Sequence, residues 1–309
     1  MDLRAHMPTV HVRERERLPE VLAQSIASVS DLSLRADGVD LHLATWPPAR
    51  RRPVRAVSLL NASLDAQDAA GLAAFLSSIA APPLSIHASM PVAAVAPAAE
   101  EAPAGRQRAH SAPQGAVDDQ DALLALDVSH NGGLGDDGVA RLLAPAYPGL
   151  RQLHIAACSL THAPDALASR TKFTSLTWLD LSNNEALDVS LYSGPGNMPN
   201  LEVLLLNNLG LDAMPPWVAS LTSLRVLSLN FNRLRALPAV LVGKLTHLEE
   251  LYAFENLLES VDAGIVLLLP KLRVLDVNRN PTLHSPPPSV ARRGSRSVLE
   301  HLWAIACTT

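Results

Sequence analysis

Residues 224–234 read LRVLSLNFNRL, and the same spacing of leucine and asparagine, L-x-x-L-x-L-x-x-N-x-L, returns along the chain. Other copies are LEELYAFENLL from Leu248, LEVLLLNNLGL from Leu201 and LRQLHIAACSL from Leu150. Three copies carry one extra residue before the last leucine: LLALDVSHNGGL from Leu123, LTWLDLSNNEAL from Leu176 and LRVLDVNRNPTL from Leu272. Weaker copies begin at Val29, Val54 and Ala81. Successive copies start 23–27 residues apart, except for one step of 42, which is the spacing of a repeat protein.

The composition agrees with one packing position that is used many times. Of 309 residues, 54 are leucine and only 11 are aromatic. The step of 42 contains Pro91–Gln120, which holds ten alanines and four prolines but no leucine, isoleucine or aromatic residue. Such a segment buries too little apolar surface to offset its ordering entropy, so we expect a mobile insert.

These copies resemble the leucine-rich repeat family over roughly residues 29–284. From Met214 onward the spacing is similar to the short intracellular class, whereas Asp65–Leu76 and Gly135–Leu143 look like the longer, ribonuclease-inhibitor-like class. The resemblance implies an α/β fold, a right-handed leucine-rich repeat solenoid with a parallel sheet on the concave face and helices or turns on the convex face. We therefore expect an N-terminal helical cap (1–28), three degenerate copies (29–90), the insert (91–120), seven further copies (121–284) and a C-terminal helical cap (285–309).

The ninth position of each copy is where the resemblance places a structural asparagine, whose side chain bonds backbone groups of the turn. Asn131, Asn184, Asn232, Asn256 and Asn280 stand there. Cys158 replaces it in one copy, which the family tolerates. Leu209 replaces it in another, and because leucine cannot form these bonds, we expect that copy to be locally irregular.

The candidate binding residues lie at the second, third, fifth, seventh and eighth positions, which we expect to line the concave face. Four aromatic residues stand there: Trp178, Phe231, Tyr252 and Phe254. Neighbouring strands lie about 4.8 Å apart, so Phe231, Tyr252 and Phe254 should form one patch. Leu205 adds apolar area, and Glu249, Glu250 and Glu255 flank the patch, as in protein interfaces. The alternative is that these aromatic residues pack on each other or on the C-terminal segment and bind nothing.

Two serines are candidate phosphorylation sites. Ser111 lies in RQRAHSAP within the insert, and Ser295 follows Arg292-Arg293-Gly294. Both contexts resemble the sites of kinases that recognise basic residues, although such short patterns also occur by chance.

Other classes of function find little support in the sequence. No phosphate-binding loop, G-x-S-x-G, H-E-x-x-H or C-x-x-C occurs, which argues against an enzyme, a bound cofactor or a metal site. The formal net charge is −5 and no basic stretch alternates with aromatic residues, so nucleic acid is not an expected direct partner. Two cysteines, no apolar run in the first twenty residues and no run long enough to span a bilayer predict a cytoplasmic protein without membrane insertion.

The resemblance implies a non-catalytic scaffold or adaptor that binds a protein partner on its concave face. Such a chain would be a subunit of a larger, cytoskeletal or axonemal, assembly. The alternative is a regulatory or substrate-recognition subunit of a phosphatase, GTPase or ubiquitin-ligase complex.

Overall fold

A computed structural model describes residues 9–11, 31–35, 56–60, 64–80, 123–169, 171–189 and 198–308. The expected N-terminal helix, the copy from Ala81, the insert at 91–120 and Ser111 lie outside these residues.

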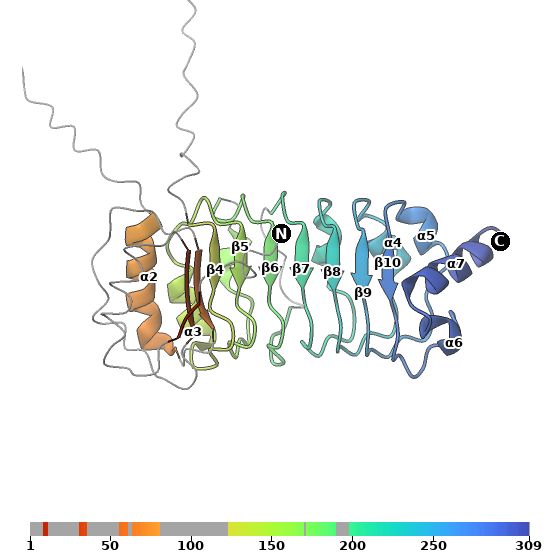
Figure 1. Ribbon diagram of the computed structural model, residues 1–309, viewed down its shortest axis with the longest axis horizontal. Helices are drawn as coiled ribbons and strands as arrows, with labels where there is room; N and C mark the ends of the chain where they lie inside the picture. Colours follow the sequence, from red (N-terminus) through yellow and green to blue (C-terminus); the bar gives the residue numbers. More distant parts are fainter. Residues whose placement is uncertain are drawn as a thin grey trace, which may run out of the picture.

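The described strands form one parallel sheet in which strand order follows chain order from β1 to β10. Figure 1 shows them side by side along the long axis of the molecule. The strands are β1 (Thr9–His11), β2 (Asp31–Arg35), β3 (Ala56–Leu60), β4 (Ala125–Asp127), β5 (Gln152–His154), β6 (Trp178–Asp180), β7 (Val203–Leu205), β8 (Val226–Ser228), β9 (Glu250–Tyr252) and β10 (Val274–Asp276).

Most of the described connections between strands return through a helix on the opposite side of the sheet (Figure 1), although the described residues between β6 and β7 contain none. The upstream helices α2 (Ala66–Ala80) and α3 (Gly135–Leu142) are long, whereas most of the downstream ones span a single turn. The remaining helices are η4 (Asp165–Ala168), η5 (Pro216–Ser220), α4 (Ala239–Val242), α5 (Ile265–Leu268), α6 (Pro288–Ala291) and α7 (Ser295–Ala306). The α/β solenoid predicted from the repeat is confirmed.

The leucines of each copy form the core between the sheet and the helices. In the copy at 224–234, Leu224, Leu227, Leu229 and Leu234 are all fully buried. The third, fourth and fifth positions of neighbouring copies pair in register, as in Val226↔Glu250, Leu227↔Leu251 and Ser228↔Tyr252. Register is fixed because a shift of one residue would turn the leucines outward.

At the C-terminal end, α7 lies where the sequence places a cap. Val298 and Leu302 on this helix are fully buried, and α7 packs against α5, α6 and the last strand. It therefore covers the apolar end that the last repeat would otherwise expose.

The described part of the upstream half differs at two points from the arrangement expected for residues 1–28 and 29–90, although the expected helix and the copy from Ala81 themselves lie outside the described residues. Thr9–His11 form a strand that pairs with β2, within the segment predicted to be a helical cap; Thr9 and Val10 are β-branched and favour a strand. The copy predicted from Ala81 does not supply a strand between its neighbours, because β3 pairs directly with β4. The helix α2 already completes the turn that begins at β3, and it packs directly on α3.

Candidate functional site

The outward side of β4–β10 and of the turns that follow these strands, here called the strand face, carries the residues that the sequence proposes for binding. The eighth position of every copy from β4 to β10 has a left-handed backbone, with φ between 52° and 61°. This is why the seventh and eighth side chains can both point outward although strand residues alternate. The eighth-position residues are His130, Ala157, Asn183, Asn208, Phe231, Glu255 and Arg279.

Phe231, Phe254 and Arg279, here called the aromatic cluster, meet at the turns after β8, β9 and β10. The rings of Phe231 and Phe254 lie edge to face with centroids 5.5 Å apart. The guanidinium of Arg279 lies over the Phe254 ring, 5.1 Å from its centroid. Phe231 is still half exposed, at 50%, so contacts within the chain leave much of this ring open to a partner.

The other apolar residues proposed for binding are spread over the strand face. Tyr252 lies on β9, two residues before Phe254, and its hydroxyl donates to Glu250 Oε2 at 2.7 Å. Burial and the neighbouring Glu250 carboxylate raise the pKa of Tyr252 to about 12. Leu205 is half-buried on β7 between Asp180 and Ser228. Trp178 lies further away on β6, where its ring is 5.8 Å from that of His154.

The three glutamates proposed as an acidic rim all interact within the chain. Glu249 pairs with Arg225 at 2.9 Å and with Arg273 at 3.9 Å. Glu255 pairs with Arg279 at 2.6 Å, and Glu250 accepts the hydrogen bond from Tyr252. The acidic charge is therefore largely balanced, and the rim is less negative than the sequence suggests.

The ninth-position asparagines are buried and join consecutive copies. Asn232 Oδ1 accepts hydrogen bonds from the Leu209 and Leu211 N–H groups of the preceding copy, at 3.1 and 3.0 Å. Its Nδ2 donates to the Leu206 and Leu229 carbonyls, at 2.8 and 2.9 Å. Equivalent bonds to backbone groups of the copy before are made by Asn131, Asn184, Asn256 and Asn280.

The irregularity expected at Leu209 is absent, since β7 pairs in register on both sides and Asn208 has the same left-handed backbone as its equivalents. An asparagine at position 209 would donate to two sixth-position carbonyls, those of Leu181 and Leu206, and each of them still accepts one hydrogen bond. Asn184 Nδ2 donates to the Leu181 carbonyl, and Asn232 Nδ2 donates to the Leu206 carbonyl. Leucine at position 209 thus removes two redundant hydrogen bonds, one to each of these carbonyls, and fills the core instead.

Three copies have one extra residue before their last leucine, and in these copies the N–H of that leucine finds an acceptor within its own copy. In these copies the N–H of the last leucine donates to the carbonyl of the asparagine three residues earlier, as for Leu187 and Asn184 at 2.9 Å. The same bond joins Leu134 to Asn131 and Leu283 to Asn280. The copy that follows has Cys158 or Leu209 at the ninth position, or is replaced by α6. The insertion therefore occurs where no following asparagine can accept that N–H.

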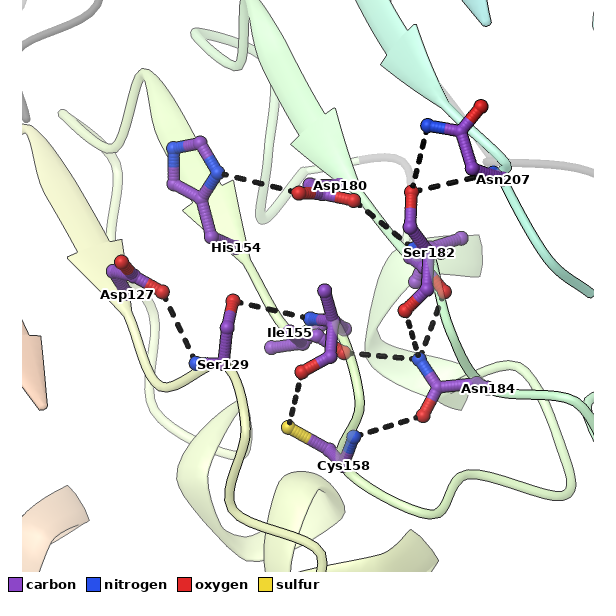
Figure 2. Close-up of polar contacts among 11 residues, drawn as sticks. Asp127, Ser129, His154, Ile155, Cys158, Asp180, Ser182, Asn184 and Asn207 are labelled. Carbon is purple, nitrogen blue, oxygen red and sulfur yellow. Dashed lines mark hydrogen bonds and ion pairs between the residues drawn. The ribbon is translucent and has the colours of Figure 1, made fainter. Parts of the chain in front are cut away.

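A second series of hydrogen bonds, which no sequence motif was used to predict, runs along the seventh position, and Figure 2 shows its part from Asp127 to Asn207. Every seventh-position N–H from β4 to β10 has a side-chain acceptor. In Ser129, Ser182 and Asn278 it is the aspartate two residues earlier. In Ala156, Asn207, Asn230 and Phe254 it is the seventh-position side chain of the preceding copy. The recurring Asp-x-Ser/Asn triplets were the available signal.

A buried polar group lies on the upstream half of the strand face. Asp127, His154 and Asp180 are register neighbours on β4, β5 and β6, and His154 Nδ1 is 3.9 Å from Asp180 Oδ2. Burial opposes ionisation of Asp180, but the nearby imidazole and hydrogen bonds from Ser182 outweigh it and lower the pKa of Asp180. This group, which no sequence motif indicated, is enclosed, so it offers less surface to a partner than the aromatic cluster does.

Cys158 takes a structural role. Its Sγ donates to the Val128 carbonyl at 3.3 Å, and burial raises the pKa of its thiol to about 12. A thiol that stays protonated in a closed site is a poor nucleophile.

Of the two candidate phosphorylation sites, Ser295 is the one that lies within the described residues. Ser295 is half-buried at the start of α7. Within the described residues, no group of three or more His, Cys, Asp or Glu side chains could hold a metal ion. No described helix combines the length and apolar character that a membrane span requires.

Comparison with known proteins agrees with this geometry. Residues 222–282 match the family model described as leucine rich repeat. The transforming growth factor beta activator LRRC33 of Danio rerio is 32% identical over 167 residues, which cover 51% of this chain and 23% of that protein. These findings support the leucine-rich repeat family, whose members generally act in protein–protein interaction.

Two solved structures are also similar. A leucine-rich repeat protein of Leptospira interrogans is 20% identical, over 60% of this chain and 45% of that one, with a TM-score of 0.41. The TLR13–ssRNA13 complex contains a chain that is 16% identical, over 87% of this chain and 37% of that one, with a TM-score of 0.46. This chain thus spans about a quarter of the curated relative and less than half of either solved chain.

Proposed function

We propose that this chain, as a leucine-rich repeat solenoid, is a non-catalytic module that binds a protein partner on its strand face. The observation that carries the proposal is Phe231, a phenylalanine that is 50% exposed at a left-handed turn. A bulky residue is unfavourable in this backbone conformation, and the core gains little from a ring that stays open to solvent. Exposed aromatic residues are the groups that most often anchor protein interfaces.

The other rows of the strand face support this choice of contact. The second position alternates in charge along Glu202, Arg225, Glu249 and Arg273, and Arg225 pairs with both glutamates. This alternation leaves no continuous basic stripe of the kind that binds a phosphate backbone, which favours a protein over a nucleic acid. The charged side chains of the second position pair with one another, whereas the Phe231 ring of the aromatic cluster stays half exposed, so the aromatic cluster offers a partner more apolar surface to bury.

Replacing Phe231 and Phe254 together by alanine tests the proposal. Partners would first be identified by proximity labelling in the native cell, then recovered on the purified wild-type and variant chains. We expect recovery to fall at least tenfold, because both rings lose their contact area. The control is Val240→Ala on α4, which removes an even more exposed apolar side chain (79%) from the helical side. Unchanged recovery by a double variant that melts like the wild type would rule out this surface.

We further propose that the chain works in the cytoplasm as a subunit of a larger, cytoskeletal or axonemal, assembly. Both cysteines are free, which suits a reducing compartment. A structural subunit should co-fractionate with its assembly through a high-salt wash. A regulatory or substrate-recognition subunit of a phosphatase, GTPase or ubiquitin-ligase complex should dissociate and exchange.

A further inference from the structure

A cleft of about 450 Å³ lies beside the aromatic cluster, between the turn after β10 and the short helix α6. Its walls include Glu255, Arg279, Pro281, Pro288 and Arg292. Arg279 belongs to both surfaces, since its guanidinium lies over the Phe254 ring and also lines the cleft. A single short segment of a partner can therefore contact the phenylalanines and enter the cleft at once.

This end of the molecule is basic although the chain as a whole is acidic. Residues 279–309 hold four arginines and one glutamate, with no lysine or aspartate, in a chain of formal net charge −5. The one glutamate, Glu300, pairs with Arg296 at 2.8 Å, and Glu255 pairs with Arg279. Arg292 forms no ion pair with the residues that the structure describes, so it is the cation of the cleft that is open to a partner's carboxylate.

We propose that the cleft binds an acidic side chain of a peptide segment whose neighbouring apolar side chain covers Phe231 and Phe254. This inference rests on the proposed function and names the chemistry of the partner. The planar guanidinium of Arg292 can hold a carboxylate through two parallel hydrogen bonds. Pro281 and Pro288 restrict the walls of the cleft to conformations with few alternatives, which lowers the entropy lost on binding. The acidic remainder of the chain repels the same carboxylate and so directs it to this end.

The charge of the cleft is tested with a random dodecapeptide display library selected on the full chain. The strongest selected peptide is then labelled with fluorescein and its Kd is measured by polarisation. We expect selected sequences to place Asp or Glu next to Leu, Phe or Ile. Arg292→Glu should weaken binding at least tenfold, and so should changing the peptide's acidic residue to its amide. Arg141→Glu on α3 is the matched control, since it makes the same charge change on an exposed arginine far from the cleft.

Three results would overturn the inference: no selected binder, selected peptides without enriched acids, or equal weakening by Arg141→Glu and Arg292→Glu. The proposed function is tested separately, by measuring partner recovery. If the Phe231/Phe254 double variant loses the partner while Arg292→Glu keeps it, the strand face binds but the acidic contact is wrong. If the double variant keeps the partner, the proposed surface itself fails.

Discussion

A buried asparagine at the ninth position serves two copies at once, which makes its side chain worth more than one hydrogen bond. Asn232 accepts from two N–H groups of the copy before and donates to carbonyls of both copies. Leu209 takes the same position in the neighbouring copy and cannot accept a hydrogen bond from the Leu187 N–H. The extra residue before Leu187 lets this N–H donate to the Asn184 carbonyl instead. The effect of losing an asparagine therefore depends on the turn that precedes it.

Asn232→Ala should destabilise the fold by roughly 3 kcal/mol, because the buried Leu209 and Leu211 N–H groups each lose their acceptor at a cost of about 1–3 kcal/mol. Chemical unfolding measures the difference. Asn200→Ala is the control: Asn200 makes one exposed bond, to the Thr174 carbonyl, and its loss should change stability by less than about 1 kcal/mol. Equal effects of the two substitutions would contradict the structural role assigned to the ninth-position asparagines.

Asp136 predicts a dependence of stability on pH. Burial opposes its ionisation, but hydrogen bonds from Thr161 and His162 together outweigh burial and lower the pKa of Asp136 from 3.8 to about 2. Because the folded-state pKa lies below the ordinary value, the carboxylate stabilises the fold above about pH 4, and this contribution is lost as the pH falls towards 2. At pH 7 the wild type should have a higher melting temperature than Asp136→Asn, and this difference should disappear near pH 2. A difference in melting temperature that stays constant or grows on acidification would contradict this assignment.

For the secondary-structure elements, the sequence predicts where strands lie better than it predicts which strands pair with each other. The spacing of Leu224, Leu227 and Leu229 requires a strand with one inward face, and β8 lies there. Nothing in a local pattern shows which strands are adjacent, so the copy expected from Ala81 was placed between β3 and β4, which in fact pair directly. The pairing depends on how α2 packs on α3, a contact between residues far apart in the chain.

The candidate site was predictable to a similar degree. The repeat register places Phe231 and Phe254 on one face, and the structure brings their rings together. The repeat register alone could not show that Arg279 lies over Phe254, because that contact needs the left-handed backbone at the eighth position. The register also could not show that the charges of Glu249 and Glu255 are balanced by arginines of the next copy.

The cap helix α7 should be essential to the downstream repeats. Leu302 is fully buried, so Leu302→Ala should destabilise the protein by about 2–5 kcal/mol through lost burial and the cavity left behind. Trp303, the next residue, is 46% exposed, and Trp303→Ala should have a much smaller effect. Thermal unfolding of the two variants measures the difference. Equal melting temperatures would mean that α7 does not close the core.

At the scale of the whole molecule, the strand face has two distinct halves. Upstream, Asp127, His154 and Asp180 are enclosed polar residues. Downstream, the aromatic cluster and the basic end with Arg292 are open to solvent. A partner that uses both apolar and ionic contacts is therefore expected to bind at the C-terminal half of the solenoid.

Site-specific photo-crosslinking tests most directly which face binds. Benzoylphenylalanine would replace Phe231 on the strand face in one variant and Val240 on the helical side in another, since both positions are well exposed. On irradiation in the native cell, we expect a crosslinked partner from position 231 and none from position 240. A partner captured from position 240 alone would contradict this expectation.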